Sequence, residues 1–101
     1  MPKRLAPDVR SAEIITAAMH CARSKGYQNV RRADIAKQAG VSDALVSRYL
    51  STMVQIKRTI MRQAVHTSDL RIVAQGLAAG DKIAGKAPPE LKSRAIAALA
   101  G

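Results

Sequence analysis

The sequence predicts an all-α protein, a small multi-helix domain of five or six helices. Apolar residues recur at three- and four-residue steps along most of the chain, which is the period of an amphipathic helix. The core must be built from Ala, other aliphatic residues and Met, because the 101-residue chain has two Tyr and no Phe or Trp. Gly and Ser residues interrupt the helical pattern where helices end and begin.

The first three expected helices lie in the first half of the chain. One spans residues 8–25, with Ile14, Ala18 and Cys21 among its apolar positions, and ends at Gly26. A shorter helix covers about residues 32–38. Gly40 can then adopt a left-handed turn conformation, and Ser42 can cap a third helix at residues 43–50.

The second half predicts further helices. One runs over about residues 54–66, and another, capped by Ser68, ends at Gly80. Residues 81–87 are expected to form a loop. Pro88, Pro89 and Glu90 then open a last helix, because Pro and an acidic residue suit a first helical turn. We divide the chain at residue 66, into a segment 1–66 and a segment 67–101.

Composition limits the classes of partner. The chain has 17 Lys and Arg against 7 Asp and Glu, a formal charge of +10. Such a charge on a folded domain favours a polyanion, with nucleic acid first and an anionic membrane a distant second. No apolar run could span a membrane, and no secretory signal follows the basic start. We therefore expect a cytoplasmic, nucleoid-associated protein with no membrane partner.

The sequence contains no arrangement typical of an enzyme or a metal site. The single cysteine, Cys21, cannot form an internal disulfide, and its apolar position indicates a core residue. The two His, His20 and His66, stand alone, so no zinc-ligand spacing exists. With no carboxylate pair, nucleophilic triad or Gly-rich phosphate loop, we expect neither catalysis nor a cofactor.

Residues 32–50 predict a helix-turn-helix within a three-helix, homeodomain-like core. Ala36 is small enough for two helices to cross closely, Gly40 makes the turn, and Val41 and Val46 fill the wedge between the helices. The second of these helices would then project as a rigid unit, a shape that the major groove of DNA admits.

The motif carries a family resemblance. The stretch from Ile14 to Leu50, IITAAMHCARSKGYQNVRRADIAKQAGVSDALVSRYL, resembles the DNA-binding domain of the tetracycline-repressor family. Its second half is also similar to the lactose-repressor helix-turn-helix, particularly at Val46, Ser47 and Arg48. Three positions depart from the first family's pattern, at Ala22, Ser47 and Met53. The resemblance implies a double-stranded DNA-binding domain. Only about fifty residues follow the motif, so we expect no small-molecule effector.

On a helical wheel of residues 43–50, one side faces away from the inward-pointing Val46 and Leu50. Arg48 is the first candidate to read a base, because its planar guanidinium can bond the O6 and N7 of guanine together; the alternative is an Arg that touches only phosphate. Asp43 can accept from cytosine or serve the helix start. The full set of candidate base-reading residues is Ser42, Asp43, Ala44, Leu45, Ser47 and Arg48.

A second set surrounds this helix and is expected to contact the phosphate backbone. The starts of neighbouring helices touch phosphates in both resembled families, although any one cation could simply be solvated. Tyr49 corresponds to a backbone-contacting position in one pattern and to a buried position in the other. The set comprises Arg31, Arg32, Lys37, Tyr49, Thr52, Lys57 and Arg58.

The helices after residue 66 are expected to form a homodimer, because helix-turn-helix proteins commonly read two half-sites. Their apolar stripes comprise Leu70, Val73, Leu77, Leu91, Ala95 and Leu99. The alternative is that these residues only cover the core of a monomer.

Two functions remain in view. The first is a sequence-specific transcriptional regulator, a repressor acting as a dimer on a palindromic operator, of the size found in phages and plasmids. The second is a basic architectural or protein-interaction module that binds nucleic acid without reading its sequence.

Overall fold

The computed structural model describes residues 7–100, and these residues form helices without strands. In chain order the elements are α1 (Pro7–Lys25), a 3₁₀ turn η1 (Tyr27–Asn29), α2 (Arg32–Ala39), α3 (Asp43–Leu50), α4 (Met53–His66), α5 (Leu70–Ala79), α6 (Lys82–Gly85) and α7 (Pro89–Ala100). The predicted all-α class is confirmed. No helix among residues 7–100 is both long and apolar enough to cross a membrane.

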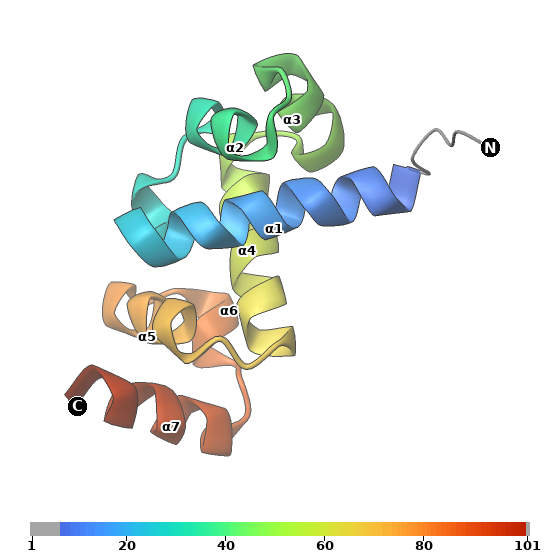
Figure 1. Ribbon diagram of the computed structural model, residues 1–101. Coiled ribbons are helices and arrows are strands. Elements are labelled where there is room, and N and C mark those ends of the chain that lie inside the picture. Colours follow the sequence, from blue (N-terminus) through green and yellow to red (C-terminus); the bar gives the residue numbers. More distant parts are fainter. Residues whose placement is uncertain (1–6, 101) are drawn as a thin grey trace.

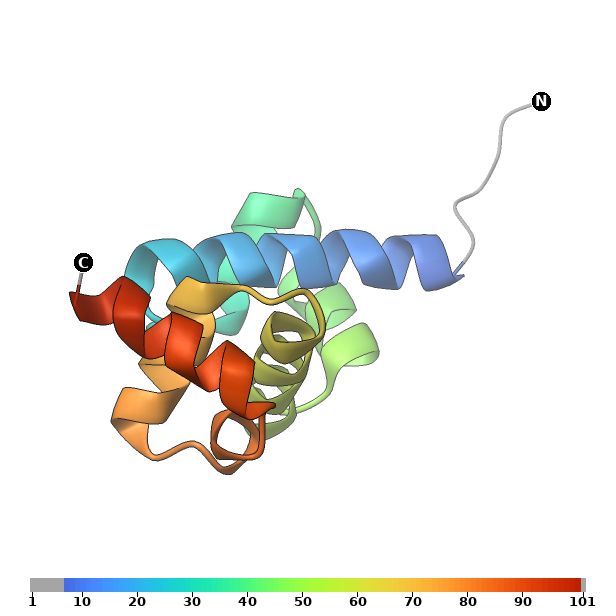
Figure 2. The same cartoon turned by 90° about the horizontal axis from the view of Figure 1, so that it is seen from below.

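The helix α4 connects two groups of helices. In Figure 1, α2 and α3 lie at one end of the molecule, α1 crosses in front of α4, and α5, α6 and α7 lie at the other end. Figure 2 shows α7 lying along the side of this second group, and α7 packs on α5. The molecule is elongated, with extents of 46 × 27 × 22 Å.

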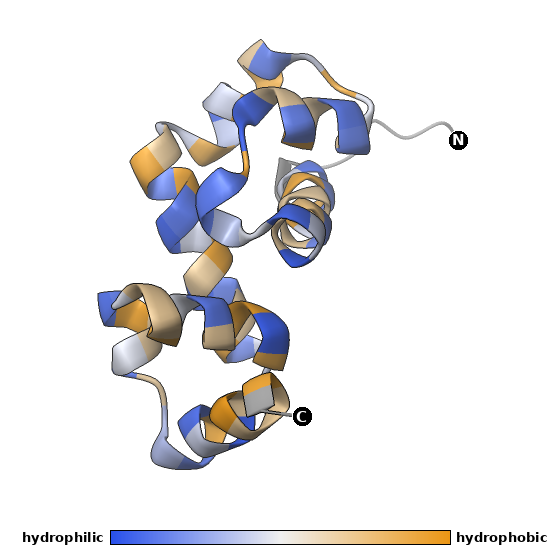
Figure 3. Ribbon diagram, turned by 90° about the vertical axis from the view of Figure 1, so that its left-hand side faces the viewer, coloured by the Kyte–Doolittle hydropathy of each residue, from blue (hydrophilic) through white to orange (hydrophobic). Residues whose placement is uncertain are grey.

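The core is continuous through both groups because α4 buries a long apolar stripe. Ile56, Ile60, Met61 and Ala64 have no exposed surface, and their spacing places them on one side of the helix. Figure 3 shows hydrophobic and hydrophilic stretches alternating along the helices of both groups, as amphipathic helices require. Tyr27 is the aromatic residue of this core, and its other members are Ala, Ile, Leu, Val, Met and Cys.

Tyr27 joins the two groups through polar contacts. Its backbone N–H donates to the Gln75 Oε1 at 2.8 Å, and the Gln75 Nε2 donates to the backbone oxygen of Ala22 at 3.2 Å. The Tyr27 hydroxyl donates to the Asp81 Oδ2 at 3.2 Å. Burial is the main cause that raises the pKa of the Tyr27 hydroxyl, so it stays a neutral donor at physiological pH. The bend before α2 is therefore fixed by α5 and by the start of α6.

Two details of the second half differ from the sequence prediction. Ser68 does not cap the fifth helix; it has a φ of 56°, and Asp69 is the cap, with its Oδ1 accepting from the Ile72 N–H at 3.2 Å. Residues 81–87 are not all loop, because Asp81 caps the four-residue helix α6 by accepting from the N–H groups of Ile83 and Ala84. The end of α5 at Gly80, with a φ of 75°, is as predicted.

Gly76 marks the tightest packing in the second group. A Cβ built on Gly76 would lie 2.5 Å from the Met61 Cε and 2.7 Å from the Ala84 Cβ. The missing side chain therefore lets α4, α5 and α6 meet.

We expect Gly76→Ala to lower the free energy of unfolding by about 1–3 kcal/mol, because overpacking outweighs the gain in helix propensity. Gly85→Ala is the matched control: no atom lies within 4 Å of a Cβ at Gly85, so that change should be neutral or stabilising. Urea unfolding measures both. A Gly76→Ala protein as stable as the wild type would contradict the packing.

Candidate DNA-binding surface

The turn between α2 and α3 is built by backbone geometry that suits glycine. Gly40 has φ 71° and ψ 35°, and the N–H of Val41 donates back to the Ala36 oxygen at 2.9 Å. A side chain at Gly40 would meet no other atom, so the left-handed backbone and not space explains the glycine. The Ser42 Oγ then accepts from the Leu45 N–H at 3.1 Å and caps α3, as the sequence predicted.

The helix α3 is held by one face and leaves the other open. Val46 has no exposed surface and Leu50 is buried, and both belong to the same core as Ile35 and Ala36 of α2. The opposite face is polar and uncovered. A rigid helix with a free polar face has the shape required to enter a major groove.

The six candidate base-reading residues differ in how exposed they are. Ser42, Asp43, Ala44 and Arg48 are exposed, whereas Leu45 and Ser47 are half-buried. Leu45 packs partly against the core, so only part of its side chain is available to a ligand. The structure thus brings Ser42, Asp43, Ala44 and Arg48 to the open side of α3 and its start.

The chain turns sharply from α3 into α4. Ser51 has a φ of 69°, a left-handed conformation that is uncommon for a residue with a side chain, and its N–H donates to the Ser47 oxygen at 2.8 Å. The Thr52 Oγ1 then caps α4 by accepting from the Gln55 N–H at 3.2 Å. The start of α4 is thereby fixed directly beside the end of α3.

The seven candidate phosphate-contacting residues surround α3. Arg31, Lys37, Thr52 and Arg58 are exposed, and Arg32, Tyr49 and Lys57 are half-buried. Tyr49 packs partly against the core, so its environment is intermediate between the backbone-contacting position and the buried position that the two family patterns imply. Among the seven, Arg31, Arg32 and Lys57 line one open hollow at the start of α2.

The hollow is lined by more basic than acidic side chains, since Asp34 is the one acidic residue among those that line it. The Arg32 Nε is buried without a hydrogen-bond partner among the described residues. Lys25 also lines the hollow, and the sequence analysis did not select it. The sequence alone does not show that Lys25, nine residues before Asp34, lines this hollow, because its position depends on how the chain folds between α1 and α2.

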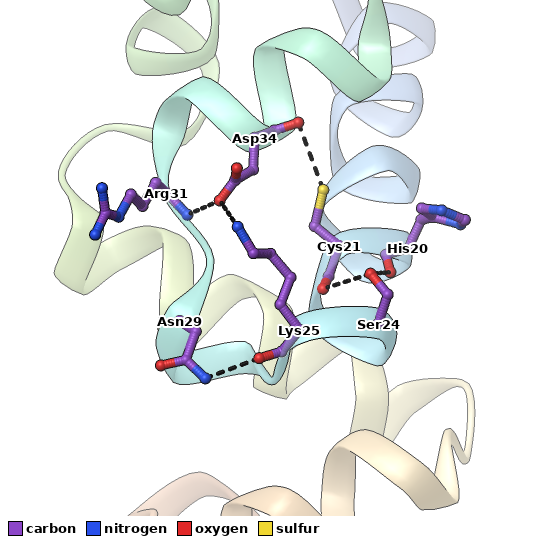
Figure 4. Close-up of polar contacts among 7 residues, drawn as sticks. All are labelled: His20, Cys21, Ser24, Lys25, Asn29, Arg31 and Asp34. Carbon is purple, nitrogen blue, oxygen red and sulfur yellow. Dashed lines mark hydrogen bonds and ion pairs between the residues drawn. The ribbon is translucent and has the colours of Figure 1, made fainter.

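Asp34 ties the start of α2 to the end of α1 (Figure 4). Its Oδ2 accepts from the Lys25 Nζ at 2.9 Å and from the Arg31 backbone N–H at 2.9 Å, and its backbone oxygen accepts from the Cys21 Sγ at 3.5 Å. The hydrogen bond from Lys25, with that from Arg31, lowers the pKa of the Asp34 carboxyl. Burial raises the pKa of the Cys21 thiol, as expected of a core cysteine.

The six candidate dimerisation residues are divided by the fold. Val73, Leu91 and Ala95 are buried within the chain's own core, and Leu70 and Leu77 are half-buried. Leu99 is 61% exposed, and the neighbouring Ile96, which the sequence pattern did not single out for dimerisation, is 56% exposed. Among the six residues, Leu99 on the outer part of α7 is therefore the exposed one, and the inner residues of the stripe join α7 to α5 instead.

Among residues 7–100, no group of three or more His, Cys, Asp or Glu side chains is placed to hold a metal ion.

Asp34→Asn should destabilise the protein at neutral pH, because the carboxylate holds Lys25 and the start of α2. Since the folded-state pKa is lowered, this stabilisation is full above the ordinary Asp pKa and is lost as the pH falls through the folded-state value. The difference between wild type and Asp34→Asn in urea midpoint should therefore shrink below about pH 4. Lys25→Met should lower the stability in the same way, and the double variant should lose less than the sum of the two single variants. A pH-independent difference would contradict this account.

Comparison with known proteins agrees with this geometry. The model of the family described as "Bacterial regulatory proteins, tetR family" matches residues 14–56, which include most of α1, all of α2 and α3, and the start of α4. Neither the curated proteins nor the solved structures include a match. Residues 14–56 are therefore a DNA-binding domain of the tetR type, and the chain that carries them is a helix-turn-helix transcription regulator.

Proposed function

We propose that this regulator recognises a specific sequence of double-stranded DNA and represses transcription by occupying a palindromic operator as a dimer. The observation that carries the proposal is the open polar face of α3, presented by a helix whose other face is anchored by Val46 and Leu50. A helix held in this way can place side chains against base edges in a fixed register.

Arg48 is the proposed principal reader. Its side chain is exposed on α3, and no ion pair among the described residues includes it. A free guanidinium can bond guanine in two places, and such a pair contributes about 1–3 kcal/mol of discrimination. Ser42 and Ala44 are short, so they allow the start of α3 to approach the bases closely.

The hollow at the start of α2 is proposed to hold a backbone phosphate. It brings together Arg31, Arg32 and Lys57, and the buried Arg32 Nε lacks a partner that a phosphate oxygen could supply. Phosphate contacts fix the register of a protein on the duplex and give no sequence information themselves. Affinity from this hollow should therefore be the same for every sequence.

Repression is proposed to need two copies, because one short helix contacts few bases. Ile96 and Leu99 are exposed apolar residues three positions apart on α7, and α7 lies at the end of the molecule away from α3 (Figure 1). Pairing through α7 would leave both reading helices free. We propose no small-molecule effector.

Arg48→Ala should reduce the preference for a selected duplex over random DNA by about 1–3 kcal/mol. Lys57→Ala, the control, should weaken both alike and reduce the slope of log affinity against log salt by about 0.9. Fluorescence anisotropy at several salt concentrations measures both. Equal affinity of the wild type for every sequence would instead favour a basic architectural module.

Selection from random duplex DNA should enrich a two-fold symmetric motif with half-sites about ten base pairs apart. Leu99→Glu should give monomers by analytical ultracentrifugation, because it places a charge on the exposed apolar end of α7. Ser93→Glu, at an exposed polar position of the same helix, should leave the mass unchanged. An asymmetric motif bound by a single copy would contradict the dimer.

A further inference from the structure

The outer sides of α4 and α6 carry positive charges that the helix-turn-helix does not account for. Arg58, Arg62, Lys82 and Lys86 are exposed and Lys57 is half-buried. No ion pair within residues 7–100 includes any of the five. The sequence has no Asp or Glu from residue 44 to residue 68. We call these five residues the α4–α6 basic face.

Asp81 is the acidic residue beside this face, and its oxygens already have partners. The Oδ1 accepts from the N–H groups of Ile83 and Ala84 at 2.8 and 3.0 Å, and the Oδ2 accepts from the Tyr27 hydroxyl at 3.2 Å. Its carboxylate therefore serves the start of α6. One carboxylate cannot balance five cations, so the face keeps a strong positive potential.

The α4–α6 basic face is continuous with the proposed phosphate hollow. Gln28 and Lys57 line the hollow at the start of α2, and the same two residues line a neighbouring hollow together with Arg58 and Asp81. Lys82 follows Asp81, and Arg62 lies one turn beyond Arg58 on α4. The cations thus lead away from the edge of the DNA-binding surface along the side of the molecule.

We propose that the α4–α6 basic face binds backbone phosphates of the same duplex, outside the segment that α3 reads, and bends this flanking DNA toward α6. The inference rests on the proposed docking of α3. The helix α4 has 14 residues, is about 21 Å long at 1.5 Å per residue, and leads away from α3 (Figure 1), so a straight duplex held at α3 would pass away from Arg62 in the second half of α4. Bending costs elastic energy, which added phosphate contacts repay. Continuity with the hollow favours the same duplex over a second one.

The test compares two probes with the same selected core: one of about 16 base pairs, and one extended to about 40 base pairs by random flanks. The wild type should bind the longer probe more tightly, with a steeper salt dependence. The double variant Arg62→Gln/Lys82→Gln should lose about two units of that salt slope on the long probe and keep its affinity for the short one. Arg71→Gln/Arg94→Gln, the matched control on α5 and α7, should behave as the wild type.

Energy transfer between dyes at the two ends of the long probe supplies a second readout. The wild type and the control should shorten the end-to-end distance, and the test variant should not. The proposal is overturned if the wild type binds both probes equally, or if the test variant still binds the long probe more tightly than the short one. It is also overturned if the same increase in affinity appears when the short probe is mixed with free random duplex, because the face would then bind a second duplex.

A failure of the proposed function would give a different result. The protein would then not discriminate between selected and random cores on the short probe, whereas the contribution of the flanks can be measured on any core.

Discussion

The burial of one stripe of α4 is the constraint on which the rest of the structure depends. Ile56, Ile60, Met61 and Ala64 have no exposed surface, and each side of the molecule supplies part of what covers them. The helices α1 and α3 of the first group and α5 and α6 of the second group all contact α4. Because both groups share this stripe, the position of α3 is coupled to the packing of the second half.

Rigidity at the reading helix comes from local closures added to that shared core. The left-handed Gly40, the Ser42 cap and the turn at Ser51 set the path of the backbone before and after α3. Asp34 and Lys25 join α2 to α1, and Gln75 and Tyr27 join the bend before α2 to α5. A helix fixed from several sides loses little conformational entropy on binding, which favours specific contacts.

Charge is organised differently from what the composition alone implies. The acidic residues outside α3 mostly work within the fold: Asp34 and Asp69 each pair with a cation of α1, and Asp81 caps α6. Many of the cations remain free on the outer faces of α2, α3, α4 and α6. The net positive charge of the chain is thus carried largely by the cations of these outer faces.

The sequence by itself determined the elements whose signals are local. Helix period, the Gly40 turn and the Ser42 cap depend on neighbouring residues, so α1 to α4 lie within one residue of their predicted bounds. Tertiary structure decided what depends on distant partners. The Asp81 that caps α6 also accepts from the distant Tyr27 hydroxyl, and Gly76 is needed because Met61 and Ala84 meet there. It also divided the last apolar stripe, burying Leu91 and Ala95 against α5 and leaving Leu99 outside, since a helical pattern specifies a face and not the neighbour that covers it.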